Sequence, residues 1–122
     1  MFAVQKLMLC VVAVACLACL AGEALCGPVN GRKYDVHRVE AYSTDRFHVS
    51  FFGDQDAAVI ISGDGDTDLD LYVYDENGNL IGSDTDSSDD CVVRFHPRWT
   101  GSFRIEVRNL GRVYNQYQIA CL

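Results

Sequence analysis

Hydrophobic and polar residues alternate with a period of two along most of this chain. The alternation is clearest in five runs, at residues 47–51, 68–74, 91–96, 103–108 and 117–121. Because successive side chains of a β-strand point to opposite faces, each run predicts a strand with one face in a core and the other in solvent. A continuous apolar run at residues 57–62 predicts a buried strand, and residues 33–42 are a further strand candidate.

The segments between these runs are typical of turns. Asn77-Gly78 lies between two apolar runs and indicates a β-hairpin. The connections that end in Gly101 and Gly111 separate further alternating runs, and no helical period is present beyond the first 26 residues. Short strands with turns every ~8–12 residues predict an all-β fold, an antiparallel β-sandwich or jelly roll of about seven or eight strands.

The N-terminal segment has a different character. A single lysine precedes an apolar run at residues 7–21, and small residues follow. This is the pattern of a secretory signal peptide, and the run is short for a membrane-spanning helix, which needs about 20 apolar residues. We therefore expect a signal peptide at residues 1–26, cleaved after Ala24 or Cys26, followed by a single β-sandwich domain at residues 27–122. An uncleaved anchor or an ordinary buried helix is the alternative.

Cleavage changes the count of cysteines. Of the six in the chain, the mature domain keeps Cys91 and Cys121, both on the core face of a predicted strand. Two cysteines in a secreted domain predict one disulfide, worth about 2–4 kcal/mol in a small core. Two buried free thiols are the alternative. Zinc is not expected, since no Cys-x-x-Cys or Cys/His pair has ligand spacing.

The charge of the chain is concentrated in one stretch. The 122 residues include 17 acidic and 10 basic side chains, a formal charge of −7. Twelve of the acidic residues lie within residues 54–90, which contain no Lys or Arg. A nucleic acid or an anionic membrane surface would require a basic patch instead. We therefore expect no nucleic-acid partner and no membrane association after signal cleavage. We also expect a monomer.

One segment carries a family resemblance. Residues 65–81 include Asp-Leu-Asp-Leu-Tyr-Val-Tyr-Asp, followed directly by Glu and then Asn-Gly-Asn-Leu. This segment resembles the bacterial pre-peptidase C-terminal domain family, and the likeness covers about residues 34–121. The resemblance implies a jelly-roll-like β-sandwich similar to collagen-binding domains and a secreted or periplasmic bacterial setting. In the family this module usually follows a secreted protease. No peptidase precedes it here, so a free-standing secreted module is expected.

The acidic run is the first candidate site. Asp64, Asp66 and Asp68 repeat at every second residue, a spacing that places carboxylates on one face of a strand. A hard cation would relieve their repulsion, and Ca²⁺ takes six to eight oxygen ligands from flexible loops. We predict a calcium site formed by these three residues with Asp84 and Asp86. The alternative is a solvated acidic face that keeps the protein soluble and protects a sheet edge from pairing.

Exposed aromatic residues form the second candidate site. Tyr72 and Tyr74 alternate with inward Leu71 and Val73, so both are expected on the outer face of the sheet. Trp99, in the turn that ends at Gly101, is a third candidate, because aromatic residues are favoured at interfaces. Packing of these rings against the core edge is the alternative.

The motifs of common enzymes are missing. There is no Gly-x-Ser-x-Gly elbow, and the three histidines lie within strand patterns. The sequence therefore predicts a secreted, non-enzymatic β-sandwich module that binds an extracellular protein or polysaccharide, with calcium as an added stabiliser. The alternative is a structural, folding or secretion accessory for another exported protein.

Overall fold

A computed structural model describes residues 27–122. The predicted signal peptide and its cleavage positions lie outside the described residues. Within the described part, no helix has the length and apolar character needed to cross a membrane.

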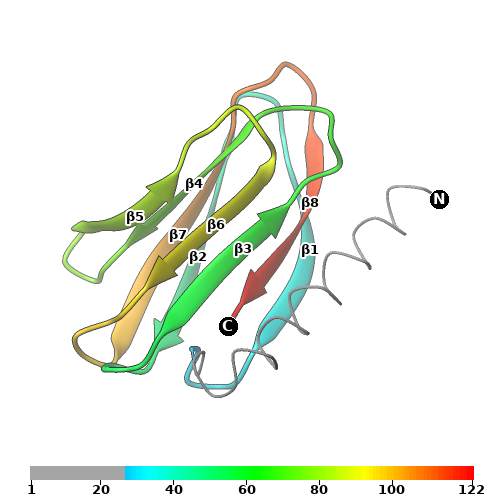
Figure 1. Cartoon of the computed structure of the whole chain (residues 1–122). Helices are drawn as coiled ribbons and strands as arrows, with labels where there is room; N and C mark the ends of the chain where they lie inside the picture. The colour runs from blue at the N-terminus through cyan, green and yellow to red at the C-terminus, as the bar shows by residue number, and fades with distance from the viewer. Residues whose placement is uncertain (1–26) are drawn as a thin grey trace.

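Eight strands make up the described chain, as the period-two pattern predicts. They are β1 Lys33–Val39, β2 Thr44–Phe51, β3 Ala57–Ser62, β4 Leu69–Tyr74, β5 Leu80–Asp84, β6 Asp90–Phe95, β7 Gly101–Asn109 and β8 Asn115–Cys121. Figure 1 traces them in chain order. The predicted all-β sandwich is therefore confirmed.

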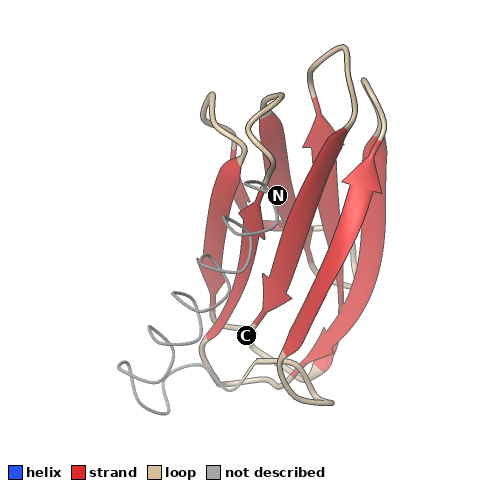
Figure 2. Ribbon diagram, turned by 90° about the vertical axis from the view of Figure 1, so that its right-hand side faces the viewer, coloured by secondary structure: helices blue, strands red, loops and turns tan. Residues whose placement is uncertain are grey.

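The strands form two antiparallel four-stranded sheets. One has the order β1-β8-β3-β6 and the other β2-β7-β4-β5. Figure 2 shows the strands standing in two layers. Buried residues recur at every second position of a strand, so each sheet turns one apolar face inward. In β6, for example, Cys91, Val93 and Phe95 are buried between exposed neighbours.

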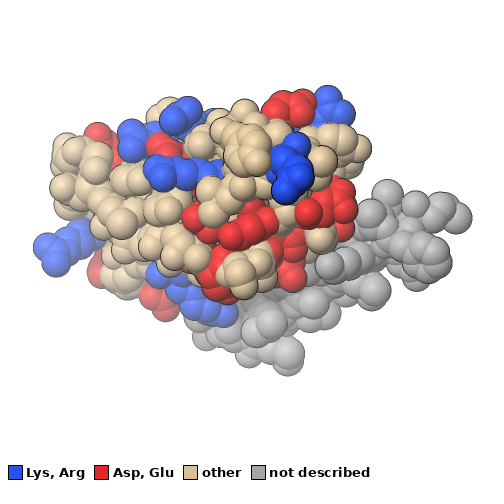
Figure 3. Space-filling view, turned by 90° about the horizontal axis from the view of Figure 1, so that it is seen from above, with Lys and Arg blue, Asp and Glu red and all other residues tan. Residues whose placement is uncertain are grey.

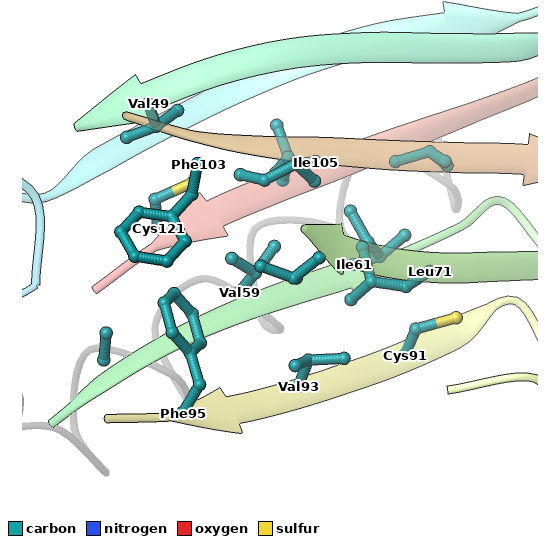
Figure 4. Packing of buried hydrophobic residues seen from close by; sticks show 14 of the residues in the cluster. Val49, Val59, Ile61, Leu71, Cys91, Val93, Phe95, Phe103, Ile105 and Cys121 are labelled. Atoms are coloured by element: carbon teal, nitrogen blue, oxygen red, sulfur yellow. The ribbon is translucent and has the colours of Figure 1, made fainter. Parts of the chain in front are cut away.

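The core lies between the sheets. Three phenylalanines fill one end of it, since Phe51 packs against Phe95 and Phe103 with ring centroids 5.0 and 5.7 Å apart and nearly perpendicular rings. Edge-to-face contacts of this kind add to the gain from burying apolar area. Val59 and Ile61 of the central strand β3 are fully buried in the same core, and Figure 4 shows Val59 near Phe95 and Phe103 and Ile61 near Leu71.

The connections divide between the two ends of the sandwich (Figure 1). The β3–β4 connection (residues 63–68) and the β5–β6 connection (residues 85–89) lie at one end, which we call the acidic end. The β4–β5 hairpin (residues 75–79) and the β6–β7 loop (residues 96–100) lie at the other, which we call the tryptophan end.

The predicted disulfide between Cys91 and Cys121 is wrong for this fold, because both residues are buried free thiols. Cys91 of β6 pairs with Ile61 of β3. Cys121 of β8 pairs with Val59 on the other edge of β3. Two strand spacings, about 9–10 Å, therefore separate their backbones, whereas a disulfide requires less than about 7 Å between Cα atoms. Figure 4 shows the two sulfur atoms well apart.

Candidate functional site

The outer surface of the sheet β2-β7-β4-β5 carries an ordered group of polar and aromatic side chains. We call it the tyrosine–arginine face, and it consists of Arg46, Tyr72, Tyr74, Arg104, Glu106 and Arg108. The sequence places each of them outward, since they alternate with buried residues along β2, β4 and β7. The two tyrosines lie where the sequence predicts them.

The pairing register of β4 and β7 places the two tyrosines opposite charged residues of β7. Tyr72 pairs with Glu106, and Tyr74 pairs with Arg104. The guanidinium carbon of Arg108 lies 4.2 Å from the ring centroid of Tyr72. That of Arg104 lies 4.4 Å from the ring centroid of Tyr74. Cations at these distances are attracted to the electron-rich ring face, so each tyrosine is held by one arginine.

A single carboxylate holds the face together. The Glu106 side chain is only 6 % exposed although it belongs to the outer surface. Its oxygens lie 2.9 Å from Arg104, 3.1 Å from Arg108 and 3.5 Å from Arg46. A buried charge is tolerated when it is paired, and three guanidinium groups provide that pairing. The hydrogen bond to Glu106 in turn raises the pKa of Arg108, so the guanidinium remains charged.

Trp99 does not belong to this face. The indole lies at the tryptophan end, where its Nε1 donates a hydrogen bond of 2.6 Å to Oε1 of Glu76 in the β4–β5 hairpin. Trp99 also lines a pocket of about 390 Å³ between the hairpin and the β6–β7 loop. The structure therefore separates Trp99 from Tyr72 and Tyr74, which the sequence grouped with it as candidate binding residues.

A histidine at the same end has a setting that the sequence did not indicate. The Nδ1 of His96 lies 2.9 Å from Asp56, and the Nε2 lies 3.1 Å from Asp54. Hydrogen bonds to Asp56 and then to Asp54 raise the pKa of His96. The two aspartates come from the β2–β3 loop, some 40 residues away in the chain, so no local pattern could have revealed the contact.

The five predicted calcium ligands do not form one set. Asp64 accepts hydrogen bonds from the backbone of Gln116 and of Asp66, at 2.9 and 3.0 Å. Asp84 accepts one from the backbone of Val92, and Asp86 accepts one from Ser88. These carboxylates therefore fix loops and strand ends.

Among the described residues, the carboxylates of the acidic end do not gather around a common point. Within residues 27–122, no three carboxylate, imidazole or thiol side chains converge as metal ligands. The structure therefore does not bring Asp64, Asp66, Asp68, Asp84 and Asp86 together as one ligand set, and the calcium site stays a prediction from the sequence.

Like charges nevertheless gather at the acidic end, as Figure 3 shows from above. Burial first, and then the charges of Asp86 and Asp89, raise the pKa of Asp68. Burial and Asp68 raise the pKa of Asp70 in the same way, and nearby Arg108 partly opposes this. The acidic end is therefore a concentrated negative patch held by its own backbone contacts.

Comparisons with known proteins show the fold of this chain. No family model matches it, and no curated protein matches it. Among solved structures, it is similar to a periplasmic lysozyme inhibitor of g-type lysozyme, PliG, from Aeromonas hydrophila. The two are 16 % identical with a TM-score of 0.59, and the match covers 74 % of this chain and 83 % of the inhibitor.

Two further solved structures are similar. The mitogen derived from Yersinia pseudotuberculosis has a TM-score of 0.60 at 10 % identity, covering 77 % of this chain and 85 % of that one. The pre-peptidase C-terminal domain of a collagenase from Bacillus anthracis has a TM-score of 0.59 at 8 % identity, covering 75 % and 89 %. The sequence resemblance to the pre-peptidase C-terminal domain is therefore confirmed at the level of the fold.

Proposed function

We propose that this protein is an extracytoplasmic, non-enzymatic module that binds an extracellular protein or polysaccharide. Of the two, the tyrosine–arginine face favours a protein. The observation that carries the proposal is the pair of cation-held tyrosines around Glu106 on an open sheet face. Tyr and Arg are the residue types, with Trp, that contribute most binding energy at protein interfaces.

The face is organised before any partner arrives. Arg104 and Arg108 are fixed between a tyrosine ring and Glu106, so binding would freeze few additional side-chain rotations. Ordering a long side chain on association costs about 0.5–1.5 kcal/mol, and this cost is largely met in the free protein. Within residues 27–122, Arg46 and Arg104 form their ion pairs through Nε. Their terminal nitrogens therefore remain donors for carboxylates or carbonyls of a partner.

The chemistry of the cysteines supports a role without catalysis. Burial raises the pKa of the Cys121 thiol to about 12, and burial also raises the pKa of Cys91, whose Sγ donates to the Leu69 carbonyl at 3.1 Å. Both residues therefore stay protonated at neutral pH and inaccessible. Nucleophilic cysteines require the thiolate and an open, electropositive setting.

The solved structures with the same fold support the proposed role and setting. One is a periplasmic inhibitor of lysozyme, and another is a domain of a collagenase. The description of the inhibitor fits a module that works outside the cytoplasm and contacts another molecule.

The test is affinity capture from the extracytoplasmic fraction of the source cells, using the full chain as bait. We expect a partner retained by the wild-type chain to be lost with the double variant Tyr72→Ala and Tyr74→Ala. Tyr34→Ala is the matched control, because Tyr34 is an exposed strand tyrosine of the other sheet. Capture that survives the double variant contradicts the proposed face. Capture of a polysaccharide, rather than a protein, that is lost with the double variant contradicts the preference for a protein.

A further inference from the structure

The pocket at the tryptophan end has a composition of its own. The hairpin and the β6–β7 loop form its walls, and Phe103 of β7 joins them from the core. Its apolar lining is Leu80, Ile81, Pro97, Trp99 and Phe103, and its polar lining is Asp75, Asn79, His96 and Arg98. A volume of about 390 Å³ is near the lower end of the range for small-ligand sites.

Contacts among the loops hold this pocket in shape. Asp75 accepts hydrogen bonds from the backbone of Asn77 and Asn79, both at 2.9 Å, and from the Asn79 amide at 3.0 Å. The bond from Trp99 to Glu76 ties the hairpin to the β6–β7 loop. His96 is fixed through both ring nitrogens, so it forms part of the wall.

The apolar lining offers a platform to a ligand. The exposed fractions are 41 % for Trp99, 54 % for Leu80 and 41 % for Ile81, although side chains of this size are usually buried. The indole face is electron-rich, so it attracts C–H groups that carry partial positive charge. A ring whose C–H bonds point to one side would satisfy this platform.

The polar lining selects a neutral ligand. Hydrogen bonds from Asn79 lower the pKa of Asp75, so its carboxylate stays ionised and disfavours an anion. The exposed guanidinium of Arg98 disfavours a cation. A carboxylate has roughly four acceptor positions, of which three are used in the hairpin, so one remains for a hydroxyl group. Arg98 supplies the complementary donors.

We infer that this pocket binds one neutral sugar ring, with its C–H face on Trp99 and its hydroxyl groups between Asp75 and Arg98. A hexose combines an apolar C–H side with several hydroxyl groups that both donate and accept, whereas a peptide side chain carries at most one hydroxyl group. The inference uses residues separate from the tyrosine–arginine face, so each site can fail without the other.

Trp99 is the only tryptophan of the chain, so its fluorescence reports on this pocket directly. The full chain is titrated with D-glucose, D-galactose, D-mannose and N-acetyl-D-glucosamine, each to high millimolar concentration, and with disaccharides of the same sugars. We expect a saturable change in emission with at least one of these sugars. We expect Arg98→Ala to weaken that binding about tenfold or more, since a charge-assisted hydrogen bond is lost.

The controls separate this site from the other. Arg94→Ala removes an exposed arginine of β6 outside the pocket and is expected to leave the titration unchanged. The double variant Tyr72→Ala and Tyr74→Ala is also expected to leave it unchanged. The absence of a saturable response to every sugar overturns the inference. Tighter binding of benzoate or benzylamine than of any sugar overturns it as well, because the pocket would then select a charge.

Discussion

At the residue scale, a carboxylate on the outer side of a sheet lies almost out of contact with water. Glu106 reaches this state because three arginines pair with it and Tyr72 stands opposite it in register, and each of these comes from a position that alternates with the core. The sequence Arg-Ile-Glu-Val-Arg at residues 104–108 places the charges on one face. The sequence alone does not indicate which neighbouring strand lies beside these charged side chains.

Glu106→Gln should destabilise the fold and loosen the face. The substitution removes the charge that holds three guanidinium groups together, and we expect a loss of about 1–2 kcal/mol in the free energy of unfolding. Urea denaturation measures it. Glu40→Gln is the matched control, since Glu40 pairs with Arg38 at 3.3 Å with both side chains well exposed. We expect that variant to change stability by less than about 0.5 kcal/mol. Equal effects of the two variants would contradict the role assigned to Glu106.

His96 should make stability depend on pH. Its folded pKa is raised by Asp56 and Asp54, so the folded state binds the proton more tightly than the unfolded state does. The stabilisation is fully present below the ordinary histidine pKa, about 6.5, and is lost as the pH rises through the raised value. We expect His96→Gln to lower the melting temperature at pH 5.5 and to have little effect at pH 9.

The two aspartates provide the control for the histidine. In the double variant Asp54→Asn and Asp56→Asn, the His96 ring has no carboxylate partners. We expect His96→Gln in that background to change the melting temperature equally at both pH values. A pH-dependent difference that persists there would assign the effect to another group.

At the scale of the elements, the two ends of the sandwich are built differently. Loops at the tryptophan end are joined by side-chain contacts between hairpin and loop, such as Trp99 to Glu76. Loops at the acidic end are held by carboxylates that accept backbone N–H groups, such as Asp64 from Gln116. The first arrangement leaves a pocket, and the second leaves a concentrated patch of negative charge.

Asp68→Asn should stabilise the protein at neutral pH. Because the folded pKa of Asp68 is raised, its ionisation penalises the folded state above that pKa, and the penalty fades as the pH falls toward the ordinary value of 3.8. We expect a gain of about 0.5 kcal/mol in low salt at pH 7. The gain should shrink at high salt, since ions screen the repulsion from Asp86 and Asp89. Destabilisation at pH 7 would contradict this repulsion.

The effect of Ca²⁺ on the melting temperature is a second test of the acidic end. Since the carboxylates there bond to the backbone and do not converge within the described residues, we expect no shift of the melting temperature between millimolar Ca²⁺ and EDTA. A rise of several degrees with Ca²⁺ alone would support the calcium site predicted from the sequence.

At the scale of the whole molecule, strand order decides the state of the cysteines. Strand β3 lies between β6 and β8, so Cys91 and Cys121 are kept on opposite sides of it. We expect both to resist alkylation in the native protein and both to be alkylated after unfolding without reductant. Peptide mass mapping measures this at each position. A Cys91–Cys121 cross-linked peptide would contradict the strand order itself.

The sequence by itself determined an antiparallel sandwich of about seven or eight strands, its main turns and the core-facing side of the alternating strands. These follow from alternation between residues i and i+2 and from turn signals such as Asn77-Gly78, which are local properties of a strand and a hairpin. The outward orientation of Tyr72 and Tyr74 follows from the same alternation. Only the tertiary structure decided which strands are neighbours, because several strands share the same alternating pattern and the pattern alone does not select a pairing partner. That choice set Tyr72 opposite Glu106, separated Trp99 from the tyrosines and kept the two cysteines apart.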